Sequence, residues 1–273
     1  MTRGSREKRE KLKMGEEQVK RNRGKKVLII TGLVALLLII QTLPVFVFAP
    51  LGSRVLSGEV VRVHYQEADT QGAREVFDLL EERCAGLRAS MKASSAGLTD
   101  VYIYHTQRQL AIREAGFITL AVAPKWHIGD SHNGNVMLVS PYTPVEVHTH
   151  ESILQAALHE YVHALVHQVN PGLSYFWDNG LATYLAGQKP DEIAFLQMQA
   201  PTLSDMHTEN GLKFGNMGGY SFSYKYIEYL DKTYGWDKVL DFASGKGTYE
   251  EVFGKSEQAL YDAWCQSINK YRS

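Results

Sequence analysis

The distribution of hydrophobic residues divides the chain into three parts. Residues 27–49 form an apolar run that contains no charged side chain. Its main interruptions are Thr31, Gly32, Gln41, Thr42 and Pro44. A run of 23 residues is long enough to cross the hydrocarbon core of a bilayer as one tilted helix. The pattern therefore predicts a transmembrane helix, preceded by a polar tail and followed by a larger folded part.

Short apolar stretches after this helix predict a few early strands and many later helices. The expected strands are residues 59–65, 100–105 and 136–139. The expected helices are residues 73–92, 107–114, 151–169, 177–187, 190–198, 221–234, 237–242 and 256–271, and the expected loops are 125–135 and 199–219. This order predicts an α+β fold with a small mixed sheet and a mainly helical C-terminal half.

The predicted organisation has four segments: a basic cytoplasmic tail (1–26), a transmembrane signal anchor (27–49), a stalk with the first strand (50–70) and an extracytoplasmic domain (71–273). The strand at 136–139 directly precedes the helix at 151–169. It is either a sheet edge, which would pair with the backbone of a peptide substrate, or an interior strand. The sequence leaves both possibilities open.

Charge is distributed unevenly on the two sides of the apolar run. Residues 1–26 contain eleven Lys or Arg and four Glu, whereas residues 51–273 contain eighteen Lys or Arg and twenty-six Asp or Glu. The positive-inside rule therefore places the N-terminus in the cytoplasm and the larger part outside it. We expect the tail to set this topology and to contact anionic lipids, and we expect no nucleic-acid partner.

A cleaved signal peptide is the alternative to an uncleaved anchor. Val47-Phe48-Ala49 is a tolerable end for cleavage, but Pro50 follows directly and the apolar run is long for a signal peptide. These features favour an uncleaved, single-pass anchor.

The segment with the clearest chemistry is His159-Glu160-x-x-His163, inside the predicted helix 151–169. Two histidines four residues apart lie on one face of a helix and can bind the same ion. A Glu between them can accept a proton from a water that the ion activates. Most other positions of this helix are apolar, so it is expected to be buried, and a metal would satisfy its buried polar groups. The pattern predicts one Zn²⁺ ion.

A catalytic zinc site needs a third protein ligand. His167 continues the four-residue spacing, but it lies about 12 Å from His159 along a helix, too far to share one ion easily. We therefore expect it near the site or on the surface. A histidine from the turn that contains His148 and His150 remains an alternative ligand.

The motif and its surroundings resemble the gluzincin metallopeptidases of the thermolysin-like superfamily. The resemblance includes Pro171 and residues 176–184 (Phe-Trp-Asp-Asn-Gly-Leu-Ala-Thr-Tyr), and weaker similarity extends over about residues 100 to 270. It implies a zincin-like domain. The family has a Glu as third ligand where this chain has Asn179, and Asp178 precedes it. Both are candidate ligands, and zinc's preference for a carboxylate favours Asp178. Gly180 is expected to let its helix pack close to the His-Glu-x-x-His helix.

The resemblance implies a membrane-anchored zinc metallopeptidase that hydrolyses peptide or protein substrates outside the cytoplasmic membrane. Glu160 would be the catalytic base and then pass the proton to the leaving amine. Tyr220 is the first candidate to stabilise the oxyanion, before Tyr224 and His207. The alternative is a catalytically degenerate zincin-like ectodomain that binds a peptide or a partner.

The remaining candidates are two histidines and two cysteines of the outer part. His127 and His132 lie in the loop 125–135, where they either shape the cleft or are solvated. Cys84 and Cys265 either form a disulfide or are two separate buried thiols, because an oxidising compartment permits both.

Overall fold

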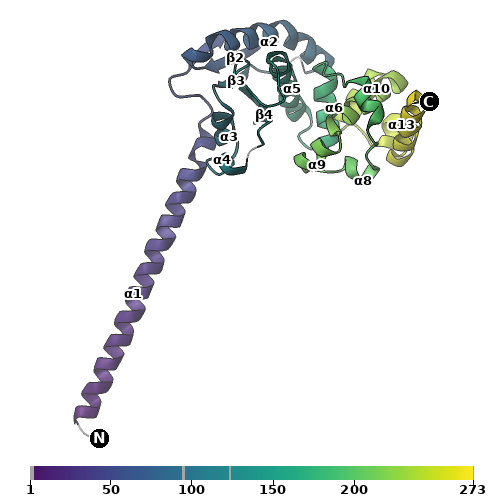
Figure 1. Cartoon of the computed structure of the whole chain (residues 1–273). Helices are drawn as coiled ribbons and strands as arrows, with labels where there is room; N and C mark the ends of the chain where they lie inside the picture. The colour runs from purple at the N-terminus through teal and green to yellow at the C-terminus, as the bar shows by residue number, and fades with distance from the viewer. Residues whose placement is uncertain (1–2, 94–95, 123, 273) are drawn as a thin grey trace. The chain divides into compact units, whose positions relative to one another are not determined.

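The computed structural model describes residues 3–93, 96–122 and 124–272. The chain separates into two compact units (Figure 1). The first unit is Met1–Phe48 with Ala111–Val122, and the second is Ala49–Leu110 with Ala123–Ser273. The second unit contains the sheet and the His-Glu-x-x-His motif.

The first unit is built on a long helix, α1 (Arg3–Thr42), which continues as a 3-10 turn over Leu43–Phe46. The 27-residue stretch Lys20–Phe46 is long and apolar enough to cross a membrane, and almost none of it is buried. The regular helix ends before Pro44 because proline lacks the amide hydrogen that would continue it. A transmembrane helix was expected here, and the length and composition of α1 agree with that expectation.

The second unit contains a five-stranded sheet in the order β1-β2-β3-β5-β4. The three central strands β2, β3 and β5 run parallel, and β1 and β4 pair antiparallel at the edges. The strands are β1 Arg54–Ser57, β2 Val61–Tyr65, β3 Thr99–Tyr104, β4 Gly129–His132 and β5 Asn135–Val139. The prediction of a mixed sheet within an α+β fold is therefore confirmed.

Two helices cover one face of this sheet: α2 (Thr70–Ser90) contacts β2, and α5 (His150–Val169) contacts β4 and β5. Alternate strand residues point to this face, as the period of two in a strand requires. They are fully buried, for example Val63, Val101 and Val136, which follow one another across the register. The sheet therefore gives α5 a rigid, apolar support.

The C-terminal half of the second unit is helical. Its helices are α6 Tyr175–Leu185, α7 Glu192–Gln197, α8 Leu203–Met206, α9 Gly211–Asn216, α10 Gly219–Tyr234, α11 Trp236–Ala243, α12 Tyr249–Phe253 and α13 Glu257–Arg272. Aromatic side chains pack between them: the Trp177 indole lies 4.5 Å from the Phe242 ring, and Tyr226 lies 5.2 Å from Trp264, measured between ring centroids. Two further helices, α3 (Gln107–Ala115) and α4 (Thr119–Val122), lie between β3 and β4 in the sequence and are not part of this half.

The close approach at Gly180 differs from the prediction. A Cβ atom there would lie 2.8 Å from Ile227 Cγ1 and 2.9 Å from the Ser223 carbonyl oxygen, both on α10. The glycine therefore allows α6 to pack against α10, and its expected role against the His-Glu-x-x-His helix was wrong.

The segment 125–135 was expected to be a loop, but it contains the edge strand β4. Its residues are polar and give no alternating pattern. The turn to β5 is Asn133-Gly134, with φ of 52° and 75°, and Asn-Gly is a strong hairpin signal. Strand β5 consequently lies in the interior, which settles the alternative that the sequence left open.

Four further short elements were not predicted. The region 199–219 contains α8 and α9 and is not one loop, α12 follows α11, and residues 54–57 form strand β1 in the stretch expected to be mainly stalk. They are too short for their periodicity to be detected. Cys84 and Cys265 are both free thiols, so the disulfide alternative is not observed.

Candidate metal and catalytic site

Helix α5, which contains the motif residues, is largely buried. Its N-terminus is capped by Thr149, whose hydroxyl accepts from the Ser152 amide, and its apolar residues pack on the sheet and on α6. His159 and Glu160 are 7% and 9% exposed. The sequence prediction that this helix is buried is confirmed.

The two histidine rings meet through one nitrogen each. His159 Nε2 and His163 Nε2 lie 3.0 Å apart, and the ring planes are at 77° to one another. The opposite nitrogen of each ring faces an oxygen: His159 Nδ1 lies 2.7 Å from Gln188 Oε1, and His163 Nδ1 lies 2.8 Å from Asp178 Oδ1. Both oxygens can only accept, so they favour the tautomer in which Nδ1 carries the proton and Nε2 turns its lone pair to the site.

Two lone pairs facing each other at this distance repel unless a cation lies between them. Protonation of one of the two rings would supply such a positive charge. Burial lowers the pKa of His159 well below its usual value, and the His163 charge lowers it further. Burial also opposes charge on His163, but the carboxylate of Asp178 and that of Glu160 outweigh it and raise its pKa. A proton held on His163, or a divalent cation, satisfies both rings.

The third ligand is the incomplete part of the site. Within the described ranges, no three His, Cys, Asp or Glu side chains are placed to hold one ion. Asp178 lies behind His163, at the nitrogen that faces away from His159. Its Oδ1 is buried and accepts no well-aligned hydrogen bond from the described residues, although it lies close to His163. Asn179 is buried too, and its amide donates to the Tyr175 carbonyl oxygen at 2.9 Å.

Glu160 lies between the histidines in the sequence and against the sheet in space. A Cβ atom on Gly129 of β4 would be 3.1 Å from its Cγ and 3.3 Å from its Oε1. These contacts are tight, so a side chain at position 129 would push the Glu160 carboxylate away by a few tenths of an ångström. Burial raises the pKa of Glu160 to about 7, although the nearby His163 charge acts in the opposite direction. The carboxylate is thus poised to exchange a proton near neutral pH.

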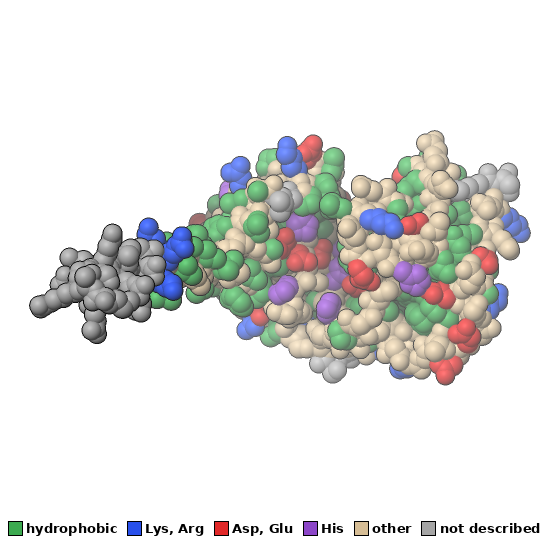
Figure 2. Space-filling model, turned by 90° about the horizontal axis from the view of Figure 1, so that it is seen from below, with side chains coloured by type: hydrophobic (Ala, Val, Ile, Leu, Met, Phe, Trp, Pro, Cys, Tyr) green, Lys and Arg blue, Asp and Glu red, His purple; other side chains and the backbone are tan. Residues whose placement is uncertain are grey.

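Two adjoining cavities open at the motif, one of about 240 Å³ and one of about 640 Å³. Both are lined by Trp126, His127, Gly129, His159, Glu160 and Tyr220. In the space-filling view, histidine and acidic side chains gather in the middle of one face (Figure 2). The motif is therefore accessible to a ligand despite its burial.

Tyr220 is the only one of the three predicted oxyanion candidates that the described cavity walls include. It is the second residue of α10, and its ring centroid lies 6.2 Å from that of His159. Burial raises the pKa of its hydroxyl, which keeps it a hydrogen-bond donor. Tyr224 packs against Tyr184 instead, and His207 pairs with Glu257 at 3.2 Å.

Some of the other histidines line the two cavities at the motif, and others lie away from them. His127 and His167 line the larger cavity, and His148 lines the smaller one. His150 pairs with Glu75 at 2.6 Å, and His132 closes strand β4. The sequence placed both His148 and His150 in the turn before the helix; His148 lies there, whereas His150 is the first residue of α5.

Sequence reasoning missed Gln188, the partner of His159. It follows α6, where Gly187 adopts a left-handed conformation with φ of 73° and the Gln188 amide returns to the Thr183 carbonyl at 2.9 Å. A glycine after a predicted helix marks such a C-cap, but no motif identifies the next side chain as a histidine partner.

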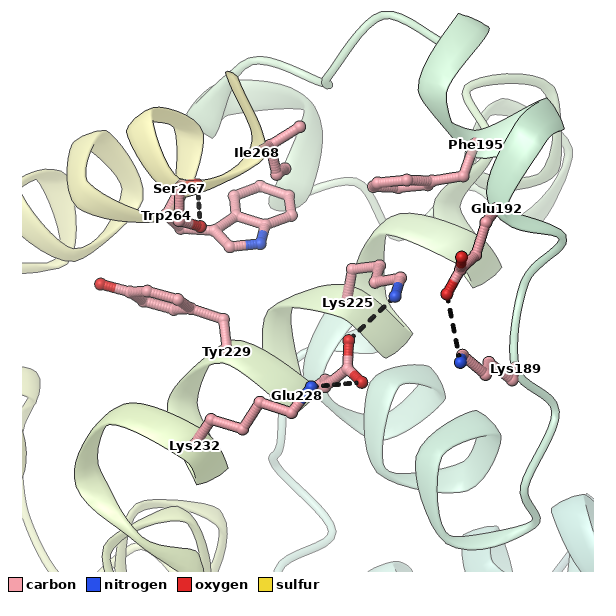
Figure 3. Close-up of a pocket in the computed structure, with 10 residues that line it drawn as sticks. All are labelled: Lys189, Glu192, Phe195, Lys225, Glu228, Tyr229, Lys232, Trp264, Ser267 and Ile268. Atoms are coloured by element: carbon pink, nitrogen blue, oxygen red, sulfur yellow. Dashed lines mark hydrogen bonds and ion pairs between the residues drawn. The ribbon is translucent and has the colours of Figure 1, made fainter. Parts of the chain in front are cut away.

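A third cavity, of about 440 Å³, lies between α7, α10 and α13 (Figure 3). Glu228 pairs there with Lys225 at 2.9 Å and with Lys232 at 2.8 Å, and Lys189 pairs with Glu192 at 3.2 Å. All five charged side chains that line this cavity are paired, with Glu228 shared by two lysines, so the cavity offers no chemistry comparable to the motif.

Comparisons with known proteins give no further identification: no family model, curated protein or solved structure matches this chain.

Proposed function

We propose that the protein is a membrane-anchored, zinc-dependent metallopeptidase that hydrolyses peptide bonds outside the cytoplasmic membrane. The observation that carries this proposal is the 3.0 Å separation of two inward-facing histidine nitrogens beside a buried glutamate. The resemblance of the motif region to thermolysin-like gluzincins supports it, and the α+β fold is compatible with a zincin-like domain.

The histidine pair fits one zinc ion. Zinc binds imidazole nitrogens at about 2.0–2.1 Å, so two of them at a tetrahedral angle lie about 3.3 Å apart, close to the separation found here. His159 and His163 would hold the ion, and Gln188 and Asp178 orient the two rings from behind. When bound, zinc supplies the Lewis acidity that polarises a peptide carbonyl and activates water.

In this proposal, Glu160 is the general base and then the general acid. Its carboxylate accepts a proton from the attacking water and returns it to the amine that leaves. A pKa raised to about 7 by burial lets the same group act as base and then as acid near neutral pH. Tyr220, in the cavity wall, would donate to the oxygen that becomes negative as the carbonyl is attacked.

Strand β4 offers a place for the substrate backbone. It is the last strand of the sheet, and Gly129 brings it against Glu160. An extended peptide that adds to such an edge forms main-chain hydrogen bonds and presents alternate side chains to pockets. Its scissile bond would then lie near the motif.

The topology follows from the charge distribution. The basic segment 1–26 precedes the apolar stretch of α1, so the positive-inside rule leaves it in the cytoplasm. The second unit, which contains the motif, would then act outside the cytoplasmic membrane.

The test replaces Glu160 with Gln in the full-length protein. Glu160→Gln should retain zinc and lose peptide hydrolysis by a factor of about 10² or more, because the general base is removed while both histidines remain. Glu151→Gln, on the exposed first turn of the same helix, is the matched control and should keep full activity. Hydrolysis at the same rate in both variants would refute the proposed role of Glu160.

A degenerate ectodomain that binds a peptide or a partner is the second candidate. One observation favours it: among the described residues, no group of three His, Cys, Asp or Glu side chains is arranged to hold a metal ion. This alternative predicts that zinc is lost on dialysis and that peptides bind without being cleaved, whereas the enzyme predicts retained zinc and cleavage.

A further inference from the structure

A short apolar segment accompanies α1 in the first unit. Gly116–Val122 forms a turn followed by α4, and three of its large side chains point away from the protein. Phe117, Ile118 and Leu120 are 46%, 63% and 52% exposed. Scattered apolar residues are normal on a surface, but three within four positions form a patch that needs a partner.

The end of α1 holds this segment through one polar side chain. Gln41 Nε2 donates to the Ala115 carbonyl oxygen at 3.0 Å, and its Oε1 accepts from the Ile118 amide at 2.9 Å. Gly116 has φ of 82°, and a Cβ atom there would overlap the Gln41 carbonyl. A glycine is therefore required for the segment to approach the helix this closely.

The position of Gln41 sets the depth of the segment in a bilayer. Lys26 is the last charged residue before the apolar run, and Gln41 follows it by fifteen residues. At about 1.5 Å per residue this is about 22 Å of helix, less than the roughly 30 Å thickness of the hydrocarbon core. If Lys26 marks one boundary of the core, Gln41 and the segment attached to it lie inside the opposite leaflet.

The hydrogen bonds of the segment suit this position. A polar side chain in hydrocarbon needs a partner, and the Gln41 amide has one for each of its two ends. Thr119 is buried, and its hydroxyl donates to the Gly116 carbonyl at 2.6 Å. The backbone amides of Thr119, Leu120 and Ala121 donate to carbonyls three residues earlier. These backbone amides are thus paired within the segment, while the side chains of Phe117, Ile118 and Leu120 are exposed.

We infer that Gly116–Val122 is a second membrane-binding element, which inserts Phe117, Ile118 and Leu120 among the acyl chains of the outer leaflet beside α1. The inference rests on the membrane-spanning role of α1 in the proposed function. The segment and α1 are joined at Gln41 and belong to the same compact unit, so a bilayer crossed by α1 would also reach the segment. Such an element would fix the depth and rotation of the anchor, as interfacial anchors do.

The experiment measures the depth of single labels in the full-length protein. Cysteine variants at Ile118 and Leu120 carry an environment-sensitive fluorophore, and the protein is reconstituted in phosphatidylcholine–phosphatidylglycerol vesicles with nitroxide-labelled acyl chains. Val34→Cys, in the middle of the apolar run, is the positive control, and Ile193→Cys, 73% exposed on α7, is the matched soluble control. The unsubstituted chain gives the background from Cys84 and Cys265.

We expect the labels at 118 and 120 to be quenched to an extent comparable with the label at 34, and the label at 193 to stay at background. Because all four positions are exposed, the substitutions leave the packing intact. Quenching at 34 without quenching at 118 and 120 would overturn the inference while leaving the anchor in place. Failure to quench at 34 would overturn both. Labels at 118 and 120 that are shielded in detergent but unquenched by lipid would identify a protein partner instead and also overturn it.

Discussion

At the scale of single residues, the histidine pair depends on the groups behind it. Asp178 is the carboxylate that faces His163 Nδ1 at 2.8 Å, and carboxylates in this position orient metal-binding rings and increase their basicity. The sequence favoured Asp178 as a ligand, whereas its place behind His163 suits it to orient the ring of a proposed metal ligand.

Asp178→Asn should weaken zinc binding by a factor of about 10–100, the usual effect of losing such a partner. Competition with a chromophoric chelator measures the affinity. Asp191→Asn is the control, because Asp191 caps α7 and an Asn there keeps the cap. Unchanged affinity in Asp178→Asn would contradict the orienting role, and complete loss of zinc would indicate a direct ligand.

Motif reasoning brought the histidine pair and Glu160 together because their arrangement is encoded in local spacing. His159, Glu160 and His163 need only one helical turn to come together. Gln188 and Gly129 reach the motif through tertiary packing, which no local pattern reports. The same holds for Asp178: the sequence identified the residue, but only the packing of α6 on α5 shows which nitrogen it faces.

At the scale of elements, the packing of α6 on α10 depends on one glycine. Gly180→Ala should lower the free energy of unfolding by about 1–3 kcal/mol, since the added methyl would contact Ile227 and the Ser223 carbonyl. Gly86→Ala in α2, with no atom within 4 Å of the new methyl, should instead stabilise by about 0.5–1 kcal/mol. Urea unfolding in detergent, followed by tryptophan fluorescence, measures both. Equal effects would contradict the proposed close contact.

The ion pairs of α10 make a prediction about pH. Burial raises the pKa of Glu228, but hydrogen bonds from Lys232 and Lys225 outweigh it and leave the pKa below its usual value. A lowered carboxyl pKa contributes stability above the unfolded value, and this contribution is lost as the pH falls through the folded value.

Glu228→Gln should therefore be less stable than the unsubstituted protein at pH 7, and the difference should disappear as the pH falls through the lowered folded pKa of Glu228. Thermal unfolding across this range measures it. Glu209→Gln, at an exposed position, is the surface control. A difference that persists at low pH would mean that the substitution acts through packing and not through charge.

Long elements were predictable and short ones were not. The helix 151–169 has five turns of periodic apolar residues, so its bounds agree with α5 to within one residue at the start. Strand β4 has four polar residues and forms only because β5 supplies a hydrogen-bonded partner. Its Asn133-Gly134 turn was the available signal. Helices α8, α9 and α12 are stabilised by side-chain caps and tertiary contacts, which cannot be detected from the spacing of apolar residues.

At the scale of the whole molecule, the chain combines a helix that is long and apolar enough to span a membrane with a sheet-and-helix unit that carries the motif. The uneven charge distribution indicated this division, and the two compact units agree with a separation after the apolar run. The exception is Ala111–Val122, which belongs to the first unit although it lies far along the chain. Sequence reasoning assigned it to the outer domain because the hydrogen bonds to Gln41 leave no periodic signal.

The central claim is that His159 and His163 hold one divalent metal ion, and elemental analysis of the purified full-length protein tests it most directly. After loading with zinc and dialysis, we expect one zinc ion per chain in the unsubstituted protein and in Glu160→Gln, and none in His163→Ala. Zinc absent from the unsubstituted protein, or retained in full by His163→Ala, would contradict the account.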